Sequence, residues 1–296
     1  MNPRELGFLL LTSSLGDPER KPLTTAQFRE LTARAQDMDP PESDRDITAN
    51  DLVKLGYNRD TAERILTLLS QKALAKRYVD RGCEKQCLPL VRLNHAYPKA
   101  VHRKLSADAP GTLWVKGDLS LMYEKSIALV GSRELNADNL DFAREVGYQA
   151  AKQGYVLISG NARGADRVAQ EACLSEGGKV ICVVADELEC QPENTDILYI
   201  AEDGYDLPFS SHRALQRNRI IHCLGQKVFV AQCALGKGGT WNGTNKNLRG
   251  KWTPVYCFDD GTDAVRELEQ QGAFLIDLNG LADFSKLPLP EMGLFD

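Results

Sequence analysis

The sequence has little of what marks a membrane, secreted or metal-dependent protein. No apolar run approaches the roughly twenty residues that a membrane-spanning helix needs. The short run at 8–11 follows Glu5 and so lacks the charge pattern of a secretion signal. Only four histidines occur, without the His-Glu-x-x-His spacing of a zinc enzyme. Cys83 and Cys87 could share a helix face, but no second pair of ligands lies near them in the sequence. We therefore expect a cytoplasmic protein with free thiols, no membrane attachment, no metal and no cofactor.

A global excess of positive charge is also missing, since the net charge at pH 7 is −5. The charges are nevertheless segregated. Residues 180–206 hold eight acidic side chains and no Lys or Arg, whereas residues 207–258 hold eight Lys or Arg and no Asp or Glu. This swing favours a basic surface for a polyanion beside an acidic patch. Two solvated faces that merely differ in charge are the alternative.

Catalytic groups are equally scarce. None of the histidines has an evident nucleophile partner in the sequence. Glu187, Glu189 and Glu193 could supply a carboxylate to a nucleotide-cleaving site, although a solvated loop is the simpler account. We therefore assign no catalytic residue.

What the sequence does contain is two glycine-rich turns, each directly after a short apolar run. The first is Gly131-Ser132-Arg133, and the second extends from Ser159 to Asp166, with Gly160, Asn161, Arg163 and Gly164 inside it. Glycine lets a backbone approach a phosphate, a helix N-terminus offers unpaired N–H groups, and arginine adds a forked charge. Asp166 could cap N–H groups or orient an arginine. Because neither turn has the spacing of the dinucleotide fingerprint or of a P-loop, the pattern predicts a phosphate site of another kind at one edge of a parallel sheet.

Two later segments add basic groups. The first, 213–221, carries Arg213, Arg217 and Arg219 on an expected helix, and no acidic residue lies near them in the sequence. The second, 236–246, is an expected glycine-rich loop with a lysine, hydroxyls and an aromatic ring; its candidate residues are Lys237, Gly239, Thr240 and Trp241. This chemistry suits single-stranded nucleic acid or a nucleotide-sized ligand.

The pattern of apolar residues divides the chain. Residues 1–80 are expected to form short helices that resemble sterile-alpha-motif or helix-hairpin-helix modules, or else a small packing domain. Helix starts are predicted at Thr24, at Thr48 and at Asp60 or Thr61, with a break at 40–46. Residues 81–125 form a connecting segment with short strands, residues 126–284 a Rossmann-like domain, and residues 285–296 a tail.

Within 126–284 strand and helix patterns alternate. The expected strands are 127–130, 156–158, 180–184, 228–231, 255–258 and 274–276, and the expected helices are 137–153, 165–176 and 213–223. Apolar strands separated by helices indicate a doubly wound α/β domain with a parallel sheet covered on both faces.

Together the motifs resemble the DNA-processing protein A family (DprA, also called Smf). The similarity runs from about Tyr97 to Phe258 and is carried by 110–118, 130–133, 159–166, Gly177-Gly178 and 217–221. The resemblance implies an extended Rossmann fold that binds single-stranded DNA, acts as a homodimer and loads a RecA-type recombinase during natural transformation, without catalysis. By motif position, the DNA contacts would come from Gly131, Ser132, Arg133, Ser159, Gly160, Asn161, Arg163, Gly164, Arg217, Asn218, Arg219, Lys237, Gly239, Thr240 and Trp241.

The chain also departs from that family. Gln170 stands where a histidine is usual, Gln232 where a glutamate is usual, and the 236–247 loop has an added tryptophan. We expect a divergent member without the C-terminal winged helix that many members carry. A nucleotide-binding sensor or phosphoribohydrolase-like enzyme of the same broad superfamily is the alternative, because residues 238–244 partly resemble the Gly-Gly-x-Gly-Thr loop of those enzymes.

Overall fold

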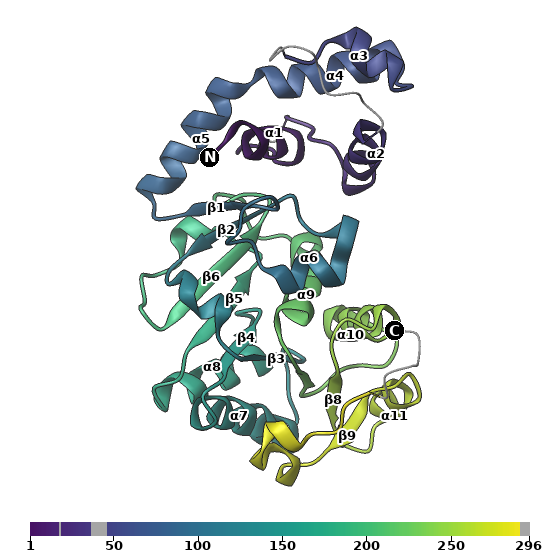
Figure 1. Ribbon diagram of the computed structural model, residues 1–296. Coiled ribbons are helices and arrows are strands. Elements are labelled where there is room, and N and C mark those ends of the chain that lie inside the picture. The colour runs from purple at the N-terminus through teal and green to yellow at the C-terminus, as the bar shows by residue number, and fades with distance from the viewer. Residues whose placement is uncertain (18, 37–45, 291–296) are drawn as a thin grey trace.

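The computed structural model describes residues 1–17, 19–36 and 46–290. A helical part formed by the N-terminal residues sits on one end of a larger part built around a sheet (Figure 1). Except for Asp46, the predicted break at 40–46 lies outside the described residues, as does the end of the predicted 285–296 tail.

The helical part contains the predicted short helices. They are α1 Pro3–Thr12, α2 Thr25–Ala35, α3 Ala49–Lys54, α4 Arg59–Ser70 and α5 Lys72–Glu84. Thr24 and Thr48 cap α2 and α3 as predicted. The prediction that Asp60 or Thr61 caps the next helix is wrong, because the Asn58 side chain accepts the Thr61 N–H at 2.8 Å.

Nine strands of the described residues form one sheet in the order β1-β2-β6-β5-β4-β3-β7-β8-β9. They are β1 Leu88–Val91, β2 Thr112–Lys116, β3 Ser126–Val130, β4 Val156–Ser159, β5 Val180–Val184, β6 Ile197–Glu202, β7 Val228–Val230, β8 Val255–Phe258 and β9 Phe274–Ile276. From β6 to β9 all neighbours are parallel, whereas β1 and β2 add an antiparallel edge. All six strands predicted after residue 125 are confirmed; the prediction missed β6.

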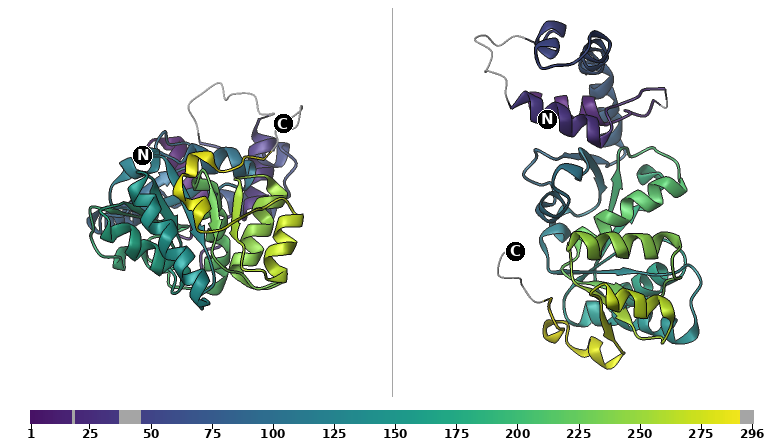
Figure 2. Two further views of the ribbon diagram at one scale, coloured as in Figure 1. Left: turned by 90° about the horizontal axis from the view of Figure 1, so that it is seen from below. Right: turned by 90° about the vertical axis from the view of Figure 1, so that its right-hand side faces the viewer.

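Helices cover both faces of the sheet. They are α6 Lys99–Leu105, α7 Ala137–Lys152, α8 Ala165–Ser175, α9 Ser211–Leu224, α10 Gly238–Gly250 and α11 Asp263–Gln270. One buried cluster joins α7 and α8 to one face, and a second joins α6, α9 and α11 to the other. Figure 2 shows these two helical layers with the sheet between them. The predicted doubly wound, Rossmann-like fold is therefore confirmed.

One predicted loop is wrong. Most of the segment 236–247 is the first part of α10. Its glycines lower helix propensity, so the sequence alone favoured a loop. Packing against α9 overrides that preference: Asn247 is fully buried, its side chain lies 3.1 Å from Nδ1 of His222 on α9, and its Oδ1 accepts the Thr253 N–H at 2.8 Å.

Strand order reverses once within the parallel part. The chain builds outward from β3 through β4 and β5 to β6, then crosses back through α9 to place β7 on the opposite side of β3. Helices leave β3 and β7 toward opposite faces, so their carboxyl ends flank a crevice. Ligands of open α/β sheets bind at this kind of reversal.

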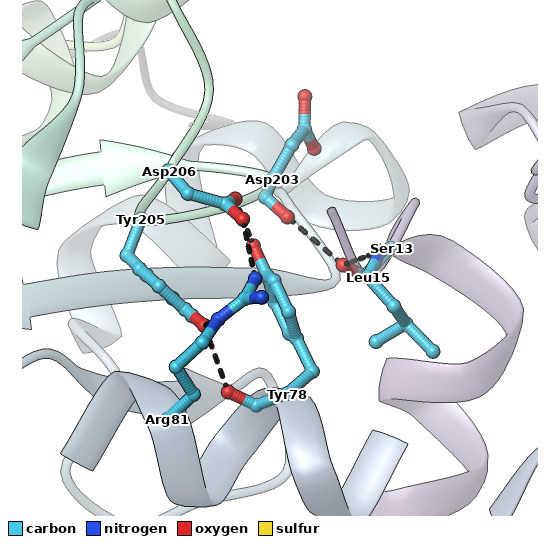
Figure 3. Close-up of polar contacts among 7 residues, drawn as sticks. All are labelled: Ser13, Leu15, Tyr78, Arg81, Asp203, Tyr205 and Asp206. Atoms are coloured by element: carbon cyan, nitrogen blue, oxygen red, sulfur yellow. Dashed lines mark hydrogen bonds and ion pairs between the residues drawn. The ribbon is translucent and has the colours of Figure 1, made fainter. Parts of the chain in front are cut away.

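The helical part is fixed to the sheet part by a compact polar cluster (Figure 3). The Tyr78 hydroxyl on α5 donates to Asp206 at 2.6 Å, and Arg81 donates to Asp206 and to the Tyr205 hydroxyl, both at 2.8 Å. Tyr205 in turn donates to the Tyr78 carbonyl at 3.0 Å, and Trp114 packs edge-on against both tyrosine rings.

None of the helices in the described ranges combines the length and the apolar character that crossing a bilayer requires. The eight cysteines, all within those ranges, are free thiols, as predicted.

Candidate nucleic-acid interface

The two glycine turns lie in direct contact. Gly164 has φ +83°, and a Cβ atom added there would lie 2.4 Å from the carbonyl oxygen of Arg133. The Ala165 N–H donates to the Ser132 carbonyl at 3.2 Å. Only glycine can bring the second turn this close to the first. The prediction that both turns meet at one edge of the sheet is confirmed.

The first turn is also tied to the segment that follows β7. The backbone N–H and the hydroxyl of Ser132 both donate to the Gln232 carbonyl, at 3.0 and 3.1 Å. The Gln232 side chain accepts the Asn136 N–H at 2.9 Å, at the start of α7. These bonds bridge the two strands on either side of the strand-order reversal. Gln232, one of the departures from the family pattern, thus helps to hold the first turn in place.

Asp166 fulfils one of the two roles that the sequence suggested, because it accepts backbone N–H groups. Its Oδ2 accepts the N–H groups of Gly160 and Ala162 at 3.1 and 3.2 Å, which fixes the second turn. The charge of Arg217 acts on this carboxylate, but no hydrogen bond or ion pair joins the two side chains among the described residues. Burial raises the pKa of the Asp166 carboxyl, while the charge of Arg217 and the two N–H donors oppose that rise.

Arg217 is the most unusual side chain of the region. It is only 7% exposed, yet its Nε and Nη1 have no hydrogen-bond partner among the described residues. Burial lowers its pKa, and the charge of Asp166 opposes that effect. A Cβ added at Gly160 would lie 1.6 Å from Nη1, so the guanidinium rests on the bare backbone of the second turn. Buried donors without partners are costly, and they need an explanation such as a missing ligand.

A cavity of about 660 Å³ opens beside this guanidinium. Eight of the predicted site residues line it: Gly131, Ser132, Arg133, Arg217, Asn218, Lys237, Gly239 and Thr240. The positive charges come from Arg133, Arg217 and Lys237, and two acids, Glu134 and Asp166, also border the cavity. It therefore occupies the crevice between the carboxyl ends of β3 and β7.

The N-terminus of α10 forms one wall of this cavity. No side chain caps its first turn, because the residue before the helix is Lys237, so the N–H groups of that turn face the cavity without a side-chain partner. The Asn218 side chain donates to the Gly239 carbonyl at 3.1 Å and thereby holds α10 against α9. Helix N-termini attract anions through these N–H groups and the helix dipole.

The remaining predicted residues lie outside the cavity wall. Ser159 is fully buried and accepts a hydrogen bond from Gln170, the second departure from the family pattern. Asn161 adopts φ +57°, and its side chain reaches Gln191 at 3.5 Å. Arg163 is exposed on the second turn and has no ion pair or hydrogen bond within the described ranges.

Two of the expected arginines are already engaged. Arg219 forms an ion pair with Glu202 of β6, and Arg213 donates to the backbone carbonyls of Ala185, Leu207 and Pro208. These partners come from other strands and loops and could not be seen near 213–219 in the sequence. Trp241 lines a different cavity, on the far side of α9.

The sequence prediction also missed members of the cavity wall. Ser211, Ala214 and Leu215 border the cavity from α9. Ala214 and Leu215 precede Arg217 or Asn218 by three or four positions, so helical periodicity applied to the expected helix would have found these two. Ser211 lies before the expected helix 213–223.

The family model for DNA recombination-mediator protein A matches residues 89–279. The chain belongs to this family. It is 31% identical over 183 residues to the DNA processing protein DprA of Streptococcus pneumoniae and 29% identical over 185 residues to the Smf protein of Escherichia coli. These matches cover 57% and 58% of the chain, but only 64% and 50% of the two relatives.

Solved structures show the same fold. The crystal structure of the Streptococcus pneumoniae protein superposes with a TM-score of 0.74 at 22% identity, over 98% of this chain and 99% of that one. DNA processing protein A of Helicobacter pylori, described for its single-stranded DNA binding mode, superposes with a TM-score of 0.56 at 23% identity, over 67% of this chain and 94% of that one.

Proposed function

We propose that this protein binds single-stranded DNA in the cavity between β3 and β7 and acts there as a recombination mediator. The observation that carries the proposal is Arg217, whose charged side chain borders the cavity while its buried Nε and Nη1 lack hydrogen-bond partners among the described residues. Phosphate oxygens that approach this guanidinium would form charge-assisted hydrogen bonds with it. Arg133, Lys237 and the first turn of α10 surround the same space and suit the rest of a phosphodiester.

Such a site gives affinity with little sequence preference, since contacts to phosphate position a strand and contacts to bases specify it. Arg163 and the second glycine turn flank the cavity and would extend the contact to a neighbouring phosphate. Gly160 and Gly164 would act indirectly, by letting the two turns and Arg217 pack together.

The mediator role has further parts that the family suggests for this chain. They are a homodimer and transfer of the bound strand to a RecA-type recombinase, with no chemistry performed on the DNA. The sedimentation of the purified protein tests the dimer. The rate at which the recombinase replaces a single-strand binding protein on DNA, with and without this protein, tests the transfer.

The salt dependence of binding tests the DNA site directly. Four cations that each neutralise one phosphate of a single strand predict a slope of about −3 for log K against log salt concentration. We expect that slope for a fluorescent oligothymidine measured by anisotropy, and weaker binding to a duplex of the same length. An affinity that hardly changes with salt would contradict the phosphate site.

Single substitutions then show which residues contribute to the salt dependence of binding. Replacing Arg133 or Arg163 with Ala removes one exposed cation each and is expected to flatten the slope by about 0.7. Arg144→Ala is a matched control, because Arg144 is an exposed arginine of α7 that pairs with Asp141. A control as damaging as Arg133→Ala would show that general charge, rather than this cavity, governs binding.

The cavity is also large enough for a mononucleotide, which keeps a nucleotide sensor or phosphoribohydrolase-like enzyme as the second candidate. Release of free base from nucleoside monophosphates would favour that candidate. Binding of oligonucleotides without any base release would favour the DNA site.

A further inference from the structure

A second cavity is formed by residues of α9 and α10 together with Trp252. It measures about 380 Å³ and is lined by Leu215, Gln216, Arg219, Trp241, Asn242, Gly243, Asn245, Lys246, Arg249 and Trp252. Two of the three tryptophans of the chain therefore line one small cavity. The third, Trp114, is fully buried near the helical part.

Both tryptophans are held in place while part of each ring stays accessible. Each is half-buried and packs its inner part against the core on this face of the sheet. Trp252 follows a sharp turn at the end of α10, where Lys251 adopts φ +48°, and its own N–H donates to the Asn247 carbonyl at 3.2 Å. A Cβ added at Gly250 would lie 2.4 Å from the indole Nε1 of Trp252, so glycine is needed there. Aromatic faces held in this way are ready to stack on a planar group.

The charges around these rings have one sign. Lys246 and Arg249 are exposed on α10, and neither has an ion pair within the described ranges. No acidic residue lines the cavity, and its third cation, Arg219, is neutralised by Glu202 behind it. Aromatic faces beside unpaired cations suit a nucleobase and its phosphate.

The two cavities are neighbours. Leu215 of α9, which is 46% exposed, borders both of them. The first turn of α10 faces the phosphate cavity, and Arg249 near its other end faces the tryptophan cavity. At 1.5 Å of rise per residue this helix spans about 16 Å between Gly238 and Arg249, a distance that a few nucleotides of extended strand can cover.

We propose that the tryptophan cavity is a base-binding subsite, in which a nucleobase of the strand held by Arg217 stacks on Trp252 or Trp241 while Lys246 and Arg249 hold the adjacent phosphate. The proposal rests on the function proposed above. It adds a second contact region, on the other side of α9, that the glycine turns do not form.

Intrinsic fluorescence reports on this subsite without a label. Trp114 is buried away from both cavities, so stacking should quench only Trp241 and Trp252. We expect a saturating oligothymidine to quench the wild-type emission, each single change Trp241→Phe or Trp252→Phe to reduce the quench, and the double variant to lose it. Bound DNA, detected by anisotropy, that leaves the wild-type emission unchanged would overturn the proposal.

Affinity gives a second, independent test. Trp252→Ala is expected to weaken binding to an oligothymidine about tenfold, as for loss of one stacked base, and to leave binding to an abasic oligonucleotide of equal length unchanged. Lys246→Ala with Arg249→Ala should weaken both oligonucleotides and flatten the salt slope by about 1.4. Tyr148→Ala, an exposed aromatic change on α7 across the sheet, is the control and should do neither.

The outcomes separate the two proposals. If Arg217→Met abolishes binding while Trp252→Ala loses equal affinity for abasic and normal strands, the base subsite is wrong and the phosphate site stands. If the wild-type protein binds no DNA, both proposals fail. The melting temperature of Trp252→Ala identifies a folding defect, and the fluorescence of the conservative Phe variants then decides the question.

Discussion

Arg217 and Arg81 differ in whether their guanidinium groups find partners within the protein. At the contact between the helical and sheet parts, the Nε and Nη2 groups of Arg81 donate to Tyr205 and Asp206. In the crevice at the strand-order reversal, the charge of Asp166 acts on Arg217, but its Nε and Nη1 have no partners among the described residues. In the first region the side chains of Tyr78, Arg81, Tyr205 and Asp206 are joined by hydrogen bonds, as in a structural contact. The second holds unsatisfied donors in place, which costs stability and prepares the region for an anion. The number of arginines therefore says less about function than the partners that each one lacks.

The largest expected effect tests this contrast directly. Arg217→Met keeps most of the side-chain volume but removes two charge-assisted donors, which is worth at least about a hundredfold in affinity. We expect that loss for an oligothymidine measured by anisotropy. The matched change Arg81→Met should leave affinity unchanged. Equal losses in the two variants would erase the distinction between the regions.

A smaller but more specific effect is expected at Gly160. A methyl group there would meet the Arg217 guanidinium at 1.6 Å and displace it from the second turn. We expect Gly160→Ala to weaken single-stranded DNA binding by about tenfold or more, close to the loss of one charged hydrogen bond. Gly7→Ala is the control, because nothing lies within 4 Å of an added Cβ in the middle of α1. If Gly160→Ala binds normally, the turn is not what positions Arg217.

His222 also has a buried nitrogen without a partner, and we expect this residue to affect stability rather than DNA binding. It is fully buried on α9, its Nε2 is without a partner in the described ranges, and that atom lies 3.1 Å from where a Cβ of Gly243 would be. Burial lowers its pKa to about 3, so the folded state keeps the ring neutral where the unfolded chain takes up a proton. Stability is therefore complete above pH 6.5 and falls as the pH drops toward 3, by up to about 1.4 kcal/mol per pH unit.

The measurement is urea unfolding between pH 7 and pH 4 for the wild type and for His222→Gln. The variant should show a flatter dependence, because it lacks the titrating ring, and its DNA affinity at pH 7 should not change. Identical pH profiles would show that carboxylates alone govern the acid response.

The smallest expected effect belongs to the satisfied region. Tyr78→Phe removes the hydroxyl that donates to Asp206 but keeps the ring stacked on Tyr205. We expect the free energy of unfolding to fall by about 1 kcal/mol, measured in urea, with unchanged affinity for DNA. A clear loss of affinity would mean that the helical part takes part in strand binding.

Much of the sheet could be predicted from the sequence. Runs of β-branched and aliphatic residues such as 127–130 and 180–184 leave few alternatives to buried parallel strands, and a glycine directly after such a run marks the turn. The proximity of the two turns followed from this, because parallel strands end at the same edge. Asp166 was placed near the start of a helix, from where its carboxylate reaches N–H groups of the second turn.

Contacts between distant segments could not be predicted in the same way. Helix α10 begins with glycines and is held against α9 by the buried Asn247 and by Asn218 of α9, a tertiary effect that local propensity does not contain. Arg219 looked free because its partner, Glu202, lies on a strand that the prediction missed. Trp241 was expected in a loop beside the glycine turns. It lies instead on helix α10, on a side of the helix that borders the second cavity.

The reversal of strand order also has a consequence for partial chains. The walls of the phosphate cavity come from two halves that are completed at different times during synthesis, and α9 crosses between them. A product that stops before Val228 would still contain both glycine turns and Arg217, but neither Lys237 nor the opposing helix. We expect a truncated protein of this kind to bind no single-stranded DNA, because part of the cavity wall and of both buried clusters is missing.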